Sequence, residues 1–248
     1  MLRFFRNIRQ KLFENGNLRK YFWYALGEIL LVVIGILIAL QINNWNQSRI
    51  EHNQLQNYYE KIIEEIESDI LLKQDFLKRH QTIIDQNKRT LTLLNSGHPD
   101  SLNELKNTLG ALSTAWSIKL TYPVLTEFKN NGFLKGVESS QLKQSLFELY
   151  TIIEFTNKMD EYIVNQYLNT IEPFVIRTFN YQAVAMKRYQ GLLVPGGPPI
   201  DYTTFGDNLE LWNTTTFKLE TTALYTEYLK NLIGQQESVI ELLKGELD

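Results

Sequence analysis

Few side chains in this sequence have the spacing of a known catalytic or metal-binding motif. The chain has three histidines, His52, His80 and His98, and none has a partner at the H-x3-H or E-x-x-H spacing of helical metal sites. His80 falls on the apolar stripe of a predicted helix, so we interpret it as a hydrogen-bonded core residue rather than a metal ligand. The chain has no cysteine, which excludes disulfides, thiolate metal sites and thiol catalysis.

The carboxylates are numerous, but no pair of them is selected for acid–base catalysis. Four acids spread around one predicted helix, which indicates a solvated face, with weak cation binding as the alternative. They are Glu64, Glu65, Glu67 and Asp69. Phosphate-binding glycine loops and the G-x-S-x-G motif are missing from the sequence. We therefore predict that the protein is not an enzyme and that it has no cofactor and no metal.

Glu28 is the most informative ionisable residue, because it lies inside an apolar segment. It forms a stripe with Val32, Gly35, Ala39 and Ile42 at 4-3-4-3 spacing, which is the spacing of one helix face. Gly35 and Ala39 make a small-xxx-small pair, which lets two helices approach closely. One interpretation is a homo-oligomeric helix contact that lines a pore. The other is a glutamate near the membrane interface that snorkels or is protonated.

The element that positions Glu28 is a predicted transmembrane helix over residues 21–44. Between Ile29 and Leu40, ten of twelve residues are Ile, Leu or Val, and they contribute on the order of −3 to −6 kcal/mol of insertion free energy. An acidic residue costs roughly 3 kcal/mol at the bilayer centre and less towards the interface, so insertion is favourable. A cleaved signal peptide is the alternative, but QINNWNQ follows the long apolar run, without a small-x-small cleavage site.

Charge predicts the orientation of this helix. Residues 1–20 hold one acid, Glu14, and six bases: Arg3, Arg6, Arg9, Lys11, Arg19 and Lys20. The whole chain has 25 bases and 28 acids, so the part that follows the apolar segment is acidic. This positive-inside pattern predicts a cytoplasmic N-terminus and a translocated C-terminal part. An acidic body also argues against nucleic acid as a partner.

Residues 1–20 are predicted to be a basic amphipathic segment on the cytoplasmic side. Apolar side chains gather on one side of its helical wheel, so the helix would lie in the headgroup layer of the bilayer. Its bases would then contact lipid headgroups through Arg3, Arg6, Arg9 and Lys11. A basic flank that only fixes the orientation of the span is the alternative.

Residues 45–248 are predicted to form an elongated antiparallel helical bundle, because helical spacing dominates and no segment alternates as strands do. The expected features are a long helix over 46–95, a second over 101–115, a helix that Ser139 or Ser140 caps and that kinks or breaks at Pro173, a loop over 191–208 and a last helix over 215–247. The loop is interpreted as a connector, with a mobile partner-binding element as the alternative.

The aromatic residues of the middle of the chain are expected to pack the core of the bundle. They are Tyr122, Phe128, Phe133, Phe147, Tyr150, Phe155, Tyr162 and Tyr167. An aromatic ligand groove is the alternative interpretation.

Two stretches resemble one family of proteins. The opening RFFRNIRQKLFENGNLRKYFWYALGEILLVVIGILIALQINNWN resembles the N-terminus of a domain-of-unknown-function family of single-pass inner-membrane proteins common in Bacteroidota. The middle TYPVLTEFKNNGFLKGVESSQLKQSLFELY resembles that family's Tyr…Leu…Gly…Leu…Leu…Tyr pattern. The resemblance implies an inner-membrane location and a helical outer domain, and it transfers no activity and no catalytic residue.

These observations lead to two functional hypotheses. The first is a membrane-anchored, non-catalytic interaction, scaffold or sensing module of the bacterial cell envelope, with a periplasmic domain. Its partners would be the lipid bilayer, an envelope protein or a second copy of the chain. The second is a homo-oligomeric ion channel or transporter subunit with the Glu28, Gly35 and Ala39 face at the oligomer axis.

Overall fold

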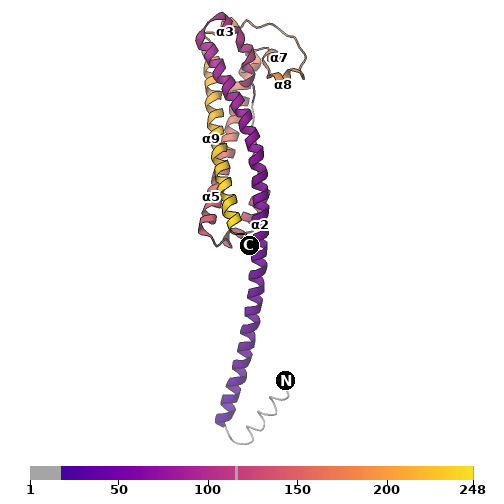
Figure 1. The fold of residues 1–248 in the computed structure, drawn as a ribbon, viewed down its shortest axis with the longest axis vertical. Coiled ribbons are helices and arrows are strands. Elements are labelled where there is room, and N and C mark those ends of the chain that lie inside the picture. Colours follow the sequence, from indigo (N-terminus) through magenta and orange to yellow (C-terminus); the bar gives the residue numbers. More distant parts are fainter. Residues whose placement is uncertain (1–17, 115–116, 248) are drawn as a thin grey trace. The chain divides into compact units, whose positions relative to one another are not determined.

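The computed structural model describes residues 18–114 and 117–247, and no strand occurs among them (Figure 1). The long helices are α2 (Leu18–Ser96), α5 (Ser140–Gln166) and α9 (Leu209–Gly245). The short elements are α3 (Pro99–Asn103), η1 (Glu104–Asn107), η2 (Leu109–Ala111), α4 (Pro123–Asn130), η3 (Phe133–Lys135), η4 (Tyr167–Ile171), α6 (Glu172–Thr178), α7 (Tyr181–Val184), α8 (Lys187–Gln190) and η5 (Tyr202–Phe205). The predicted all-α class is confirmed.

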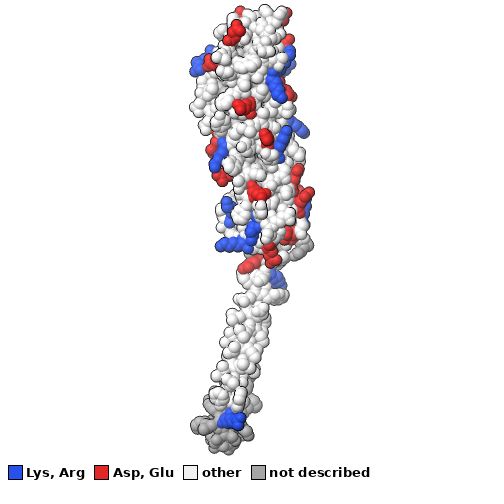
Figure 2. All heavy atoms as spheres, turned by 90° about the vertical axis from the view of Figure 1, so that its left-hand side faces the viewer, with Lys and Arg blue, Asp and Glu red and all other residues white. Residues whose placement is uncertain are grey.

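The chain divides into two compact units, residues 1–55 and 56–248, and α2 begins in the first and ends in the second. The described part of the first unit is a stretch of α2 whose apolar side chains no other described element covers. This stretch is long and apolar enough to cross a membrane, and none of its apolar window is buried. Figure 2 shows a band of uncharged atoms along it on the face drawn.

The predicted amphipathic segment lies almost wholly outside the described residues, as do the four bases assigned to headgroup contact. These bases are Arg3, Arg6, Arg9 and Lys11.

The second unit is a bundle built on α9, which runs antiparallel to both other long helices. As residue numbers rise on α2 they fall on α9, from the pair Asp69 and Gln236 to the pair His80 and Tyr225. The hydrogen bonds between α5 and α9 follow the same rule. Helices α2 and α5 therefore run in the same direction. The chain achieves this because residues 117–122 run back along the bundle before α4 begins, from Ile118 beside Asp160 to Leu120 beside Asn157.

Local sequence signals set several of the helix ends. The Ser139 hydroxyl accepts a hydrogen bond from the Leu142 N–H over 3.2 Å and caps α5, as predicted. Near Pro173, where the sequence predicts a kink or break, the chain stays helical but changes to a π-helical turn, η4, after which the proline occupies the first turn of α6. The last helix begins earlier than predicted, because the Asn208 side chain caps its N-terminus.

The helix predicted over residues 101–115 is wrong in its length, since the chain forms α3 and two 3-10 turns that end at Ala111. Within these turns, Gly110 touches the backbone of another segment. A Cβ atom at this position would lie 2.6 Å from the carbonyl oxygen of Val184 and 2.7 Å from the backbone nitrogen of Met186. The close approach of the two backbones requires a residue without a side chain.

Candidate functional site

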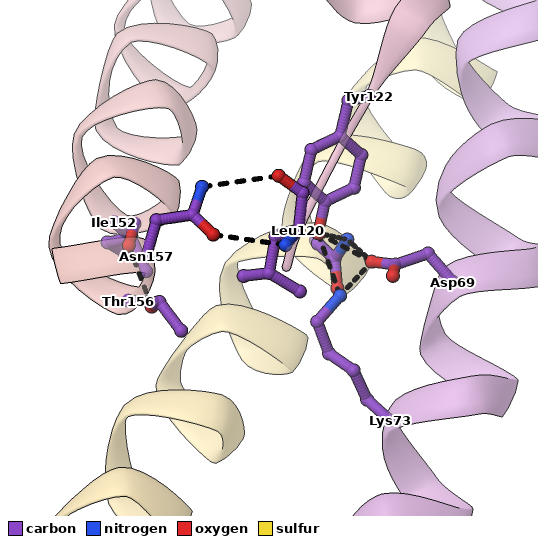
Figure 3. A network of polar contacts seen from close by, with 8 residues as sticks. Asp69, Lys73, Leu120, Tyr122, Ile152, Thr156 and Asn157 are labelled. Atoms are coloured by element: carbon purple, nitrogen blue, oxygen red, sulfur yellow. Dashed lines mark hydrogen bonds and ion pairs between the residues drawn. The ribbon is translucent and has the colours of Figure 1, made fainter. Parts of the chain in front are cut away.

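A closed network of polar side chains joins three elements inside the bundle (Figure 3). Asp69 and Lys73 lie one turn apart on α2 and form an ion pair. The hydroxyl of Tyr122, just before α4, donates to Asp69 Oδ2 over 2.6 Å and accepts from Lys73 Nζ over 2.7 Å. From α9, Gln236 Nε2 donates to Asp69 Oδ2 over 2.7 Å. Gln236 Oε1 accepts from Lys73 Nζ over 3.3 Å.

The electrostatics of this network resemble those of a proton-transfer site, but its geometry does not. Burial lowers the pKa of Lys73 to about 7, and burial raises the pKa of Tyr122. An amine that is neutral near pH 7 can act as a general base where a substrate reaches it. Lys73 and Gln236, however, are 0% exposed, and neighbouring side chains already engage the ammonium. The network therefore fixes the positions of α2, α4 and α9 relative to one another.

Side chains of α5 and α9 hold the returning segment in place beside the network. Asn157 forms two hydrogen bonds with the backbone of Leu120, accepting from its N–H over 3.0 Å and donating to its carbonyl over 3.2 Å (Figure 3). One oxygen of Asp160 accepts from the Ile118 N–H and from the Tyr225 hydroxyl, each over 3.0 Å. The extended backbone is thus satisfied by side chains of helices rather than by a sheet.

The interpretation of the acidic run on α2 as a solvated face is wrong for two of its four members. Asp69 enters the network above. Glu65 accepts hydrogen bonds from the N–H groups of Val124 and Leu125 over 2.8 and 3.0 Å, and so caps the N-terminus of α4 from another helix. Glu67 is half-exposed and pairs with a lysine of α9. Among residues 18–114 and 117–247, no group of three or more His, Cys, Asp and Glu side chains could hold a metal ion.

His80 is a core residue, as its position on the apolar stripe predicted. Its side chain is 2% exposed, and Nδ1 lies 3.0 Å from the carbonyl oxygen of Phe76. The imidazole also packs against the rings of Phe76 and Tyr225, with centroids 4.4 and 5.5 Å away.

A shallow, open groove lies along the outer face of α5, and α5 alone lines it. Its lining is Ser140, Lys143, Gln144, Phe147, Glu148, Thr151 and Ile152. Phe147 is 52% exposed, and two further aromatic residues follow it on the same helix, Phe155 at 55% and Tyr162 at 47% exposure. The prediction that these three rings pack the core is therefore wrong, although Tyr122 and Phe128 are buried as expected.

The spacing of these three exposed rings explains why the prediction of a core position was wrong, and it could have shown their exposure from the sequence. On a wheel of about 100° per residue, Phe147, Phe155 and Tyr162 fall on the side of α5 opposite to Leu142 and Leu149, which are both buried. The helix therefore carries large apolar side chains on two sides, and only one of these sides meets the bundle. The number of aromatic residues in a helix does not show on which side of the helix they lie.

The predicted transmembrane face keeps the helical arrangement that its spacing implied. Glu28, Val32, Gly35, Ala39 and Ile42 all lie on the first part of α2. Val32 and Ile42 are 55% and 60% exposed, and a Cβ atom at Gly35 would meet no atom within 4 Å. No other described element covers this face from Val32 onward, so it is open to lipid or to another chain.

Comparison with protein-family models gave no match, and comparisons with curated proteins and with solved structures gave no significant match. The assignment of function therefore rests on the residues and the geometry described above.

Proposed function

We propose that this chain is a non-catalytic, membrane-anchored interaction module of the bacterial cell envelope that associates with a second copy of itself. In this proposal residues 21–44 span the inner membrane, residues 1–20 stay in the cytoplasm and residues 45–248 lie in the periplasm. The apolar stretch of α2 supports the anchor, and the basic residues before it support the orientation.

The observation that carries the interaction role is the row of exposed aromatic rings on α5. Three half-exposed aromatic rings, at Phe147, Phe155 and Tyr162, line one side of this helix, and a groove opens beside the first of them. Aromatic residues in such a row are typical of binding surfaces rather than of surfaces that face water alone.

Membrane anchoring favours a second copy as the occupant. Anchored copies share one orientation, so a two-fold axis along the membrane normal brings the same face of each copy together at the same height. Phe147 and Phe155 would then meet their equivalents, with Lys143 and Glu148 of the groove at the rim.

The cysteine-free sequence permits a direct test of this contact. A single cysteine replaces Thr151 on the proposed face, and the matched control places it at Lys230, an exposed position of α9. After mild oxidation of intact membranes we expect a disulfide-linked dimer for Thr151→Cys and little for Lys230→Cys. The double variant Phe147→Glu/Phe155→Glu, built into Thr151→Cys, should lose the cross-link. Equal cross-linking at both positions, or none, would overturn the proposal.

The membrane placement has a separate test. Protease added to spheroplasts should remove residues 45–248 and leave residues 1–20 protected, since the bilayer shields only the cytoplasmic side. Protection of the C-terminal domain would refute the orientation. Recovery of the chain in the soluble fraction without detergent would refute the anchor.

A channel or transporter subunit is the second candidate, because the stripe that begins at Glu28 continues over Gly35 and Ala39, and the part with Gly35 and Ala39 is exposed among the described residues. It requires a ring of several copies, whereas the first proposal requires a dimer. A purified ring of four or more, together with ion flux in liposomes that changes on Glu28→Gln, would replace the first proposal with this one.

A further inference from the structure

A second polar layer crosses the bundle beyond His80, and its hydrogen bonds are incomplete. It consists of Asn87 on α2 and of Thr215 and Lys218 on α9. Asn87 and Thr215 are 0% exposed and Lys218 is 2% exposed. Both polar atoms of the Asn87 amide and the Thr215 hydroxyl have no hydrogen-bond partner. Within the described ranges, the Lys218 ammonium forms no hydrogen bond and no ion pair, and it lies over an aromatic ring.

The register of α2 and α9 places these side chains at one level. On one side of the layer the ring of His80 packs against that of Tyr225. On the other side Leu94 and Leu211 belong to one core cluster. The pairs Asp69 with Gln236 and His80 with Tyr225 set this register, and two helical turns beyond the second pair it brings the asparagine level with the lysine of this layer.

Most threonines of α9 satisfy their hydroxyls within the helix, whereas Thr215 does not. In α9 the hydroxyls of Thr216, Thr221, Thr222 and Thr226 each donate to the carbonyl four residues earlier, over 2.7 to 3.0 Å. This is the usual way for a helical threonine to satisfy its hydroxyl. Thr215 is buried without that bond, so its hydroxyl is left to donate to a group inside the bundle.

The charge of Lys218 is also uncompensated. Burial alone lowers the pKa of Lys218 to about 8, so the ammonium is mostly protonated at neutral pH. Its Nζ lies 5.9 Å from the ring centroid of Tyr167, whose hydroxyl donates to the carbonyl of Ser113 over 3.0 Å. Tyr167 begins the π-helical turn η4, and such turns occur often at functional sites. A buried cation without an anionic partner is unfavourable by itself.

We propose that Asn87, Thr215 and Lys218 bind a small monovalent anion of halide size inside the bundle. An amide N–H, a hydroxyl and an ammonium are all hydrogen-bond donors, and the ammonium supplies the opposite charge. The burial of all three side chains excludes a large ligand. This site depends neither on the membrane span nor on the face of α5, so its test is independent of theirs.

The anion dependence of thermal stability tests this site. The full chain in a nonionic detergent is unfolded by heat in sodium chloride and in sodium gluconate of equal ionic strength, because gluconate is too large for the site. We expect the midpoint temperature of unfolding to rise with the chloride concentration. The rise should be on the order of 5 °C between a concentration near the Kd for chloride and one a hundredfold higher. Lys230→Met removes an exposed charge from the same helix and should keep this response.

Two variants separate binding from a general salt effect. Lys218→Met removes the ammonium and should abolish the chloride response. Asn87→Asp should also abolish it while raising the midpoint in gluconate, because the new carboxylate supplies the negative charge, and this variant decides the matter if Lys218→Met does not fold. Crystals grown in bromide should show anomalous density at hydrogen-bond distance from Lys218 Nζ. A chloride response that persists unchanged in Asn87→Asp would overturn the proposal. The absence of anomalous bromide density next to Lys218 Nζ would also overturn it.

Discussion

The buried ion pair of Asp69 and Lys73 predicts a large coupling free energy between two neighbouring side chains. Asp69→Leu leaves the ammonium, which is 0% exposed, with neutral partners only, and breaking a buried pair in this way costs about 3–5 kcal/mol of unfolding free energy. Lys73→Met should cost less, about 2–3 kcal/mol, because the Asp69 side chain is 17% exposed and keeps its bonds from Tyr122 and Gln236.

The double variant Asp69→Leu/Lys73→Met removes both charges and should cost only about 1–2 kcal/mol, mainly for the polar partners left behind. The coupling free energy is then about 3 kcal/mol or more. Glu154 and Lys158 on α5 supply the matched control, because they have the same four-residue spacing but are 69% and 63% exposed. Their coupling should be about 0.3–0.5 kcal/mol.

Urea unfolding of the full chain in detergent, followed by circular dichroism, measures all of these free energies. The network reasoning predicts that the buried pair couples several times more strongly than the exposed pair. If the double-mutant cycles of the buried and the exposed pair give equal coupling free energies, the closed network does not hold α2, α4 and α9 together.

Three further predictions use the same measurement of stability. Gly110→Ala should cost about 1–3 kcal/mol, since its Cβ would meet backbone atoms 2.6 and 2.7 Å away; Gly136→Ala, with its closest atom at 3.5 Å, should be nearly neutral, and equal losses would contradict the close approach. Glu65→Ala removes the cap of α4 and should cost about 1–2 kcal/mol, whereas Glu64→Ala at an exposed position should change little; a loss in both would point to a charge effect instead. The pKa of Lys218 is about 8 in the folded chain and about 10.4 when unfolded, so the unfolded state binds more protons between these values. In sodium gluconate, where the proposed anion is not bound, the unfolding free energy of the wild type should therefore rise by about 2 kcal/mol relative to Lys218→Met from about pH 7 to 9.5, and parallel pH profiles would show that the amine is not buried.

Interactions within a few residues of chain are what the sequence alone predicted well. The apolar stretch of α2, the Ser139 cap and the irregular turn next to Pro173 depend on side chains close to the backbone that they affect. Such signals act whatever the remainder of the chain does. The helical class and the position of His80 in the core also followed from periodicity, because a 3.6-residue period assigns each side chain to a face.

The tertiary structure decided which face of each helix meets another element and which meets solvent. Glu65 and Asp69 turn inward because α4 and Tyr122 lie against them, at separations of more than 50 residues in sequence. Phe147 remains exposed because α9 packs on the other side of α5. Periodicity shows which side chains share a face of a helix. Whether that face is buried depends on the element that packs against it, and the path of the whole chain decides which element that is. The parallel course of α2 and α5 and the incomplete polar layer at Lys218 follow from that path.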